Sequence, residues 1–170
     1  MLYEDECSMS NTATVSYQWS RKGKQPVIAC KQRQRERQTV FGSYNYGNGQ
    51  ITISFAQRGN TESFRRHLKK VLHTYRTAPK IIMVLDNVRY HHAKRLQLWL
   101  SKHPKLELVF LPPYSPDLNA VERAWWYMRK KITNNRYLYS LKDRKKQFWM
   151  MFSHFLKPNE ELKKVCEINY

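Results

Sequence analysis

Alternating apolar and polar positions predict a β-hairpin in the first third of the chain. The runs Gln38–Tyr46 and Gln50–Gln57 are rich in β-branched and aromatic residues, and apolar and polar side chains alternate from Ile51 to Phe55. Residues 47–49, Gly-Asn-Gly, join the two runs, and Asn-Gly is the strongest short signal for a hairpin turn. We therefore expect two antiparallel strands here.

Two shorter runs before this hairpin, residues 15–19 and 26–30, are further candidate strands, and residues 20–24 form the loop between them. The segment of residues 21–37 carries seven basic residues and one acid. Such a segment is either a solvated basic surface or a surface that faces DNA, and the charge pattern leaves both interpretations open.

Beyond Gly59 the hydrophobic period changes to that of a helix. Apolar residues from Phe64 to Tyr75 recur at helical spacing, and Asn60 or Thr61 is available as the N-cap. The same spacing predicts helices over residues 92–103, 119–132 and 141–156.

Continuous apolar runs between these helices predict strands that are buried on both faces. One covers residues 80–86 and ends in a carboxylate, and another covers residues 106–111 and is closed by two prolines. The order of strands, helix, strand, helix, strand and helix is typical of an α/β fold with a mixed sheet flanked by helices.

The composition fits one globular domain with a polyanionic partner. The 170 residues are enough for one hydrophobic core and too few for two comfortable ones. Lys and Arg number 31 against 13 Asp and Glu, so the net charge of +18 favours nucleic acid, with an anionic membrane surface second. The longest apolar run, residues 81–85, is far below the roughly 20 residues of a membrane-spanning helix.

The first residues and the cysteines favour a reducing cytoplasm. The sequence Met-Leu-Tyr-Glu-Asp-Glu is acidic where a signal peptide would be basic and then apolar. Cys7, Cys30 and Cys166 are widely spaced, odd in number and without a CxxC motif, which argues against a disulfide framework and a zinc site.

Three acids are candidates for chemistry, and each also has a purely structural interpretation. Asp86 ends a predicted strand, where catalytic groups collect in α/β sheets, but it could instead turn the chain or cap the next helix. Asp5 lies in the acidic cluster of residues 4–6, and such clusters are usually solvated. Glu122 stands three residues after Asn119, which is the spacing of a capping box.

The adjacent pair His91-His92 is a weaker candidate for a metal site. Neighbouring residues on a helix point about 100° apart, so helix capping or contact with DNA is the preferred interpretation of this pair.

Longer motifs connect two of the acids to a known family. Residues 84–91, Val-Leu-Asp-Asn-Val-Arg-Tyr-His, and residues 111–125, Leu-Pro-Pro-Tyr-Ser-Pro-Asp-Leu-Asn-Ala-Val-Glu-Arg-Ala-Trp, resemble the mariner superfamily of DDE transposases, in particular its bacterial insertion-sequence branch. In that family the second acid opens an Asp-Asn-x-x-x-His element, and the third is the Glu of Pro-Tyr-Ser-Pro-Asp-Leu-Asn-x-x-Glu-x-x-Trp. These acids match Asp86 and Glu122, with 35 residues between them. Ala120 departs from the usual Pro of the second element.

The first acid of the family lies in an Asp-Glu pair at the end of the first strand and is followed by a Trp-x-x-x-Gly element. Asp5-Glu6 matches the pair, and residues 19–23 match the second element, so the resemblance runs from about residue 2 to residue 132.

The resemblance implies an RNase H-like fold that brings the three acids together around Mg²⁺. Two hard cations roughly 3.5 to 4 Å apart can neutralise the attacking and leaving oxygens of a DNA phosphodiester, and hard cations prefer carboxylate ligands. We expect Asp5, Asp86 and Glu122 to be both the catalytic residues and the metal ligands, with Mn²⁺ able to replace Mg²⁺. The expected active-site neighbours are Asn87, His91 and Asn119, and the expected DNA contacts are Arg21, Lys22, Lys24, Arg123, Arg129 and Lys130.

The same resemblance implies DNA cleavage and strand transfer during transposition. The expected partners are double-stranded transposon ends, a target at TA, a second copy of the chain and a separately encoded helix-turn-helix protein, all at the nucleoid. Residues 1–135 would form the catalytic domain, with a shortened first strand, and residues 136–170 a helical extension packed on it. Two alternatives stay open: an inactive basic remnant or partial product that binds DNA without cutting it, and a structure-specific nuclease of the same fold.

Overall fold

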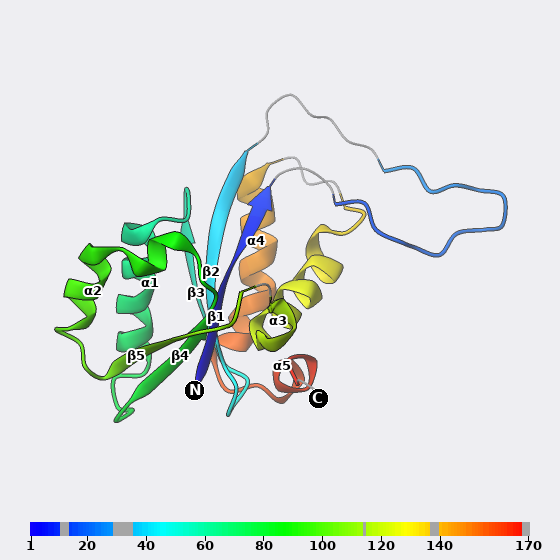
Figure 1. The fold of residues 1–170 in the computed structure, drawn as a ribbon. Coiled ribbons are helices and arrows are strands. Elements are labelled where there is room, and N and C mark those ends of the chain that lie inside the picture. The colour runs from blue at the N-terminus through cyan, green and yellow to red at the C-terminus, as the bar shows by residue number, and fades with distance from the viewer. Residues whose placement is uncertain (11–13, 29–35, 114, 137–139, 168–170) are drawn as a thin grey trace.

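The computed structural model describes residues 1–10, 14–28, 36–113, 115–136 and 140–167 (Figure 1). Its strands are β1 (Leu2–Ser10), β2 (Arg37–Asn45), β3 (Ile51–Ala56), β4 (Ile81–Leu85) and β5 (Leu106–Phe110). Its α-helices are α1 (Thr61–Thr74), α2 (Lys94–Leu100), α3 (Ala120–Met128), α4 (Leu141–Phe152) and α5 (Glu160–Val165). Shorter helical turns are η1 (Arg89–His92), η2 (Pro116–Leu118), η3 (Arg129–Thr133) and η4 (Ser153–Leu156).

The strands form one mixed sheet in the order β3-β2-β1-β4-β5. The strands β1, β2 and β3 are antiparallel neighbours, whereas β4 is parallel to both β1 and β5. Helices α1 and α2 lie on one side of the sheet, and α3, α4 and α5 lie on the other (Figure 1). The predicted α/β fold with a mixed sheet flanked by helices is confirmed.

The predicted hairpin is formed by β2 and β3. The Gln50 carbonyl oxygen accepts from the Asn45 N–H at 2.7 Å, and the Asn45 carbonyl oxygen accepts from the Gly49 N–H at 2.9 Å. Gly49 has a φ of +72°, a left-handed conformation that glycine adopts without steric cost. The turn therefore sets the register in which Tyr44 faces Ile51.

The strand β1 is held mainly by β2. Nine residue pairs run from Leu2 opposite Asn45 to Ser10 opposite Arg37, whereas only Leu2 and Tyr3 pair with β4. Asp5 thus lies in the middle of the strand, and the prediction that it ends the strand is wrong. The strand is longer than predicted because β1 continues to pair with β2 beyond the residues that pair with β4.

The strands β4 and β5 are buried on one face only, which corrects the prediction of strands buried on both. Ile81, Met83 and Leu85 pack under α1 and α2, whereas Ile82 is 38% exposed and Val109 is 41% exposed. The sequence did not reveal that one face is exposed, because both faces of these strands carry β-branched or aliphatic side chains.

A projecting arm, residues 14–28, replaces the shorter strands predicted before the hairpin. Residues 15–19 and 26–28 have no strand partner among the described residues, and residues 29 and 30 lie outside the described part of the chain. Four apolar side chains of the arm, Val15, Tyr17, Trp19 and Val27, are each at least 81% exposed, and Ile28 is partly exposed. The arm extends away from the sheet (Figure 1), so its β-type residues have no strand edge to pair with.

Two apolar clusters fill the space between the sheet and the helices. One lies under α1 and α2, and the other joins β1, β2 and β3 to α3, α4 and α5 through residues that include Trp125, Phe148, Phe152 and Leu162. Helix α5 was not predicted, because six residues are too few to display a helical period. The helices after residue 135 therefore share a core with α3, and the domain division at that residue stays a prediction.

The other predicted helices are confirmed in position and corrected at their ends. Asn60 is the N-cap of α1 and forms a capping box with Ser63. The helix predicted over residues 92–103 is reduced to α2, and the one over residues 119–132 is α3 followed by a π turn. None of the helices in the described ranges is long and apolar enough to cross a bilayer.

Candidate functional site

Asp5, Asp86 and Glu122 line a single cavity of about 550 Å³. Asp5 comes from the middle of β1, Asp86 directly follows β4, and Glu122 lies in the first turn of α3. The cavity is also lined by Asn87, Val88, Leu111, Pro112, Pro113, Ser115, Pro116 and Asn119. The fold thus brings together the three acids and two of their expected neighbours.

The carboxylate of Glu122 is not used to cap its helix, so the capping-box interpretation is wrong. The side chain of Asn119 does not cap α3, and its Nδ2 instead donates to the carbonyl oxygen of Glu4 at 2.9 Å. The first turn of α3 is therefore fastened to β1, while the Glu122 side chain stays 39% exposed at the cavity.

A close contact beside Asp5 sets the distance between α3 and the sheet. Gly42 pairs directly with Asp5 across the β1–β2 ladder, and a Cβ atom at this position would overlap the ring of Trp125. Trp125 is fully buried and lies one helical turn after Glu122. The missing side chain of Gly42 thus lets α3 approach β1 closely enough to bring Glu122 near Asp5.

Asp86 accepts one local hydrogen bond and remains open to the cavity. The Val88 N–H donates to Asp86 Oδ1 at 3.3 Å, so the turning role considered for this residue is present in part. Asn87 Nδ2 donates to the Leu111 carbonyl oxygen at 2.8 Å and links the segments that follow β4 and β5. The Asp86 side chain is still 45% exposed.

Burial, and after it mutual repulsion, raises the pKa values of Asp5 and Asp86. The pKa of Asp5 is raised to about 8 by burial, then by the negative charge of Glu122 and to a smaller extent by Glu6 and Asp86, while a hydrogen bond from the Glu6 backbone opposes the shift. Burial and then Glu6 also raise the pKa of Asp86, although His91 opposes the shift. A bound cation would relieve this repulsion, because it would stabilise the ionised form of each carboxylate.

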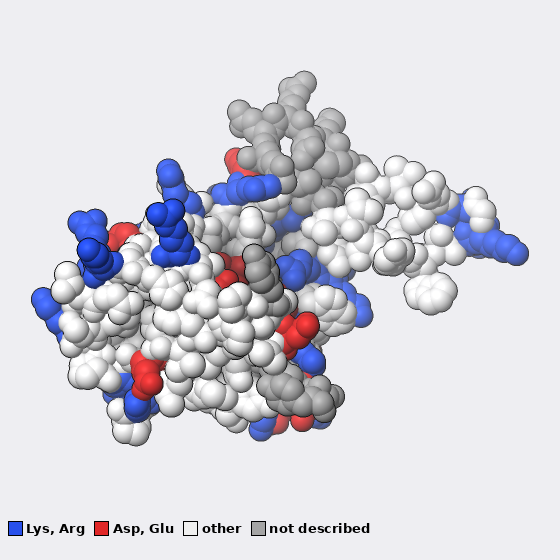
Figure 2. All heavy atoms as spheres, viewed as in Figure 1, with Lys and Arg blue, Asp and Glu red and all other residues white. Residues whose placement is uncertain are grey.

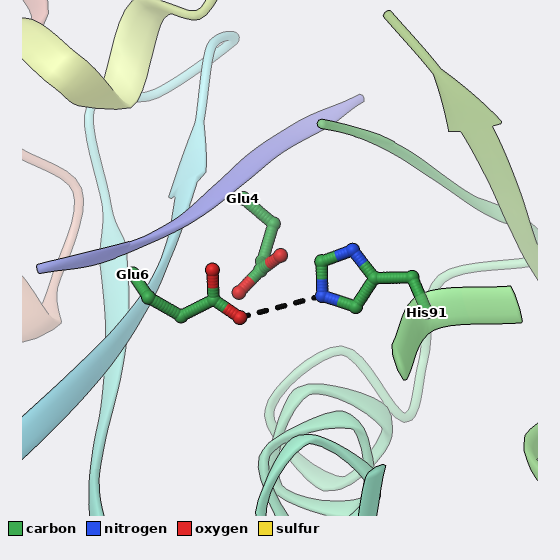
Figure 3. Close-up of side chains that lie close together, drawn as sticks. All are labelled: Glu4, Glu6 and His91. Carbon is green, nitrogen blue, oxygen red and sulfur yellow. Dashed lines mark hydrogen bonds and ion pairs between the residues drawn. The ribbon is translucent and has the colours of Figure 1, made fainter. Parts of the chain in front are cut away.

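A second acidic group lies on the opposite face of β1. Glu4 and Glu6 alternate with Asp5 along the strand and point toward His91 (Figure 3). His91 Nε2 lies 3.3 Å from Glu6 Oε1, and its Nδ1 lies 3.5 Å from Asp86 Oδ1. Burial, followed by the charge of Glu6, raises the pKa of Glu4 well above its usual value.

This group was missed at the sequence level. His91 is completely buried, which leaves it no surface for contact with DNA, and as an expected active-site neighbour it lies 3.5 Å from Asp86 Oδ1. His92 is exposed, with its Nε2 3.1 Å from Asn87 Oδ1. Glu4 is also completely buried, although clusters of acids are usually solvated. The alternation of β1 would have placed Glu4 and Glu6 on one face, but it does not reveal that α1 and η1 cover that face.

The predicted DNA-contacting residues lie in two places. Arg21, Lys22 and Lys24 stand at the exposed turn of the arm, where the Lys24 N–H donates to the Arg21 carbonyl oxygen at 2.9 Å and Gly23 has a φ of +79°. Basic side chains gather at the tip of this arm and over the region of α1 and α2 on the face shown in Figure 2.

The remaining basic candidates lie on or next to α3. Arg129 Nη2 is 3.9 Å from Glu122 Oε2, and Lys130 Nζ lies 5.0 Å from the centre of the Trp126 ring. Arg123 Nη1 donates to the Glu167 carbonyl oxygen, so part of its hydrogen-bonding capacity is used within the chain. Arg129 is the basic residue in this set with a recorded contact to a cavity acid.

Comparison with known proteins identifies the family to which these features belong. Residues 1–145 match the family described as "DDE superfamily endonuclease". The chain belongs to this family. A curated relative of this DDE endonuclease chain, the "Insertion element IS630 uncharacterized 39 kDa protein" of Shigella sonnei, is 30% identical over 135 residues, which are 79% of this chain and 39% of the relative.

Solved structures share the fold of this DDE endonuclease chain. The Mos1 transposase paired-end complex with the left transposon end superposes with a TM-score of 0.73 at 16% identity, over 97% of this chain and 50% of the Mos1 chain. Paired-end complexes of mariner Mos1 with Mn and with Mg give TM-scores of 0.72 and 0.69 at 15% and 14% identity, again over 97% of this chain and 51% and 52% of the Mos1 chains. The chain therefore has the RNase H-like fold, and it spans about half the length of the Mos1 chains.

Proposed function

We propose that this chain is the catalytic part of a DDE transposase that cuts transposon ends and joins them to target DNA by metal-dependent phosphoryl transfer. The observation that carries the proposal is the single cavity lined by Asp5, Asp86 and Glu122. Membership of the DDE endonuclease family supports the reaction, and the Mos1 complex with a transposon end supports the DNA substrate.

The donor set fits Mg²⁺. The three side chains offer only carboxylate oxygens, which hard cations prefer over nitrogen or sulfur. Burial, and after it the charge of Glu122, raises the pKa of Asp5, and a divalent cation between the acids would offset both effects. The Mos1 complexes with Mg and Mn support the choice of ion, and we propose two ions with Mn²⁺ able to replace Mg²⁺.

Some residues of the chain would bind the metal ions, and others would hold the ligands in position. Asp5 and Asp86 would share the ions, and Glu122 would hold one of them from α3. Bound Mg²⁺ supplies a polarised phosphoryl oxygen and an acidified water, or later an acidified 3′-hydroxyl, for attack on the phosphodiester. Asn119 would keep α3 fixed against β1 through its bond to the Glu4 carbonyl oxygen, so that Glu122 stays in reach.

Residues outside the cavity would bind and position the DNA. Arg129 lies beside Glu122 and would contact a phosphate entering the cavity, while Arg21, Lys22 and Lys24 would contact the backbone from the arm. Arg123 and Lys130 extend this surface along α3. A target at TA, a second copy of the chain, a separately encoded helix-turn-helix partner and a place at the nucleoid complete the proposal.

The decisive experiment is a nicking assay with DNA that carries the element's own ends. We expect cleavage that requires Mg²⁺ and that falls by more than about 100-fold in Glu122→Gln, because even residues one step removed from a metal cost about 10–100-fold. The matched control is Glu107→Gln on β5, which removes an exposed acid paired with Lys80 far from the cavity.

Two results would contradict the proposal. Cleavage by Glu122→Gln at the parental rate would remove the assignment of the third acid. Binding of DNA without any metal-dependent cutting would instead support the interpretation of the chain as an inactive DNA-binding protein.

A further inference from the structure

Glu4 is a completely buried carboxylate without a partner. Its exposed fraction is 0%, and neither Oε1 nor Oε2 has a hydrogen-bond partner among the residues that the structure describes. A buried ionised carboxylate is expensive unless it is paired, hydrogen-bonded or bound to a metal. The side chain lies between β1 and η1, close to the side chains of Glu6 and His91 (Figure 3).

The three side chains are close enough to share one cation. A carboxylate oxygen of Glu4, a carboxylate oxygen of Glu6 and a ring nitrogen of His91 all lie within 4.8 Å of one another. Glu4 and Glu6 project from the face of β1 opposite to Asp5, whereas His91 also lies 3.5 Å from Asp86 Oδ1, so the group adjoins the cavity without sharing its other two acids. Two carboxylates this close repel each other, and a divalent cation would neutralise both.

Both nitrogens of His91 face hydrogen-bond acceptors. Nδ1 lies 3.3 Å from the carbonyl oxygen of Asp86, and Nε2 lies 3.3 Å from Glu6 Oε1. A neutral imidazole carries one N–H, so it satisfies only one of these contacts. If Nδ1 donates to Asp86, the lone pair of Nε2 faces Glu6, and a cation between them turns repulsion into attraction.

The hydrogen-bond partners of His91 and Glu6 resemble those that usually hold metal ligands in place. A ligating histidine commonly donates its other ring N–H to a backbone carbonyl, and ligating carboxylates are themselves hydrogen-bonded. His91 has the Asp86 carbonyl oxygen beside Nδ1, and Glu6 accepts from the hydroxyl of Tyr90. The His91 ring is also packed against Phe64 and Tyr90, with ring centres 4.2 and 4.6 Å away.

We propose that Glu4, Glu6 and His91 form a buried site for a divalent cation of borderline softness, such as Zn²⁺, distinct from the Mg²⁺ site of the cavity. An imidazole nitrogen together with two carboxylates favours Zn²⁺ over Mg²⁺, and three protein ligands leave a fourth position for water. Glu6 is 13% exposed and marks the side from which the ion enters.

The site would have a structural role. It would tie β1 to η1, the turn that directly follows the Asp86 segment, where β1 no longer pairs with β4. The ion would thus replace ladder hydrogen bonds that the diverging strands cannot make.

The test uses the tag-free chain with Asp5→Asn and Glu122→Gln, which removes two cavity carboxylates and makes the result independent of the proposed function. After dialysis against Zn²⁺, we expect one bound equivalent by mass spectrometry of the metal. At about 100 times the dissociation constant, Zn²⁺ should raise the Tm by about 5–10 °C, whereas Mg²⁺ should leave it unchanged.

Adding Glu4→Gln should abolish both the zinc equivalent and the Tm increase. Because glutamine has the same shape and no charge, this variant should fold at least as stably as its parent in EDTA, as checked by circular dichroism. The matched control is Glu62→Gln, which removes an exposed acid on α1 and should keep the zinc.

A Co²⁺ titration provides the second measurement. Co²⁺ should give a visible absorption band of a nitrogen- and oxygen-bound site in the parent and no such band in Glu4→Gln. Zinc that persists in Glu4→Gln, or a parent that takes up no zinc at all, would overturn the proposal and leave a proton on Glu4 as the neutralising species.

Discussion

Asp5 occupies a position in which one proton controls the charge of the cavity. Its pKa is raised to about 8, first by burial and then by the charge of Glu122. Metal ligands must be deprotonated, so an ion can bind to Asp5 at neutral pH only if the proton leaves. If Asp5 holds a metal ion, as proposed, proton release is coupled to metal binding at this residue.

The apparent affinity for Mg²⁺ should rise with pH until it levels off above about pH 8. The rise should be at most about tenfold per pH unit for a single proton. Calorimetry at pH 7 in two buffers of different ionisation enthalpy measures the protons released, and Asp5→Asn should lose both the release and most of the affinity. A flat affinity between pH 6 and pH 8, with no proton release, would contradict this role of Asp5.

The same shift has the opposite effect on the metal-free fold. Between the usual value of 3.8 and about 8, the folded state keeps a proton on Asp5 that the unfolded state has lost. The free energy of unfolding should therefore fall as pH rises through this window, and Asp5→Asn should reduce the slope in urea titrations.

At the residue scale, sequence motifs identified two of the cavity acids specifically and the third less specifically. Asp86 and Glu122 stand in long, specific motifs, whereas Asp5 rests on a shorter match, the pair Asp5-Glu6 followed by the element of residues 19–23. The environment of Glu4 and His91 could not be predicted, because burial depends on η1 folding back against β1 from more than 80 positions along the chain.

Among the helices and strands, the position of α3 depends on its contact with β2. The ring of Trp125 lies over Gly42, directly beside Asp5 in the ladder. A larger residue at position 42 must push α3 outward, because the sheet below is held on both sides and Trp125 is fully buried.

Gly42→Ala should therefore destabilise the protein by about 1–3 kcal/mol, the usual cost of overpacking a core. It should also weaken Mg²⁺ binding, since Glu122 moves with α3. Thermal unfolding and metal titration check both effects. The matched control is Gly47→Ala in the hairpin turn, where an added Cβ meets only the Asn45 side chain at 3.4 Å and should change neither quantity much. Equal effects of the two substitutions would contradict the positioning role of Gly42.

The hydrophobic period predicted the longer elements that pack on the sheet, and it failed for the short helix α5 and for the arm. The core side of α1, α3 and α4 produces a helical stripe, and the hairpin produces alternation, so these elements were predicted within a few residues. Residues 15–19 have β-type composition, but strands need a partner edge, and sequence composition does not show whether one is available.

At the scale of the whole molecule, acidic and basic side chains are unevenly distributed. The net charge is +18, yet acids from β1, from α3 and from the residue after β4 converge on one cavity, and basic side chains lie on the arm and around the helices (Figure 2). Under the proposed function, the basic groups draw DNA toward a site that is itself negative until metal binds.

Binding of DNA should accordingly depend steeply on salt, with a log–log slope of about −0.9 for each phosphate contacted. Replacing Arg21, Lys22 and Lys24 by Ala should make the slope shallower by up to about 2.7. The control with the same loss of charge replaces Lys157, Lys163 and Lys164, which lie at and near α5, away from the arm (Figure 1). Fluorescence anisotropy over a range of salt concentrations measures both slopes, and identical changes in the two triple variants would exclude a specific role of the arm.

The acids of β1 also have a consequence for synthesis of the chain on the ribosome. The strands β1, β2 and β3 are neighbours in sequence and can pair early, whereas β4 follows only after α1. Among the described residues, only Leu2 and Tyr3 of β1 pair with β4, so the edge of β1 at Glu4 to Glu6 has no β4 partner even after β4 has formed. Three consecutive carboxylates should make that edge repel its own copies, so the residues proposed to hold metal ions would also protect the nascent chain against aggregation.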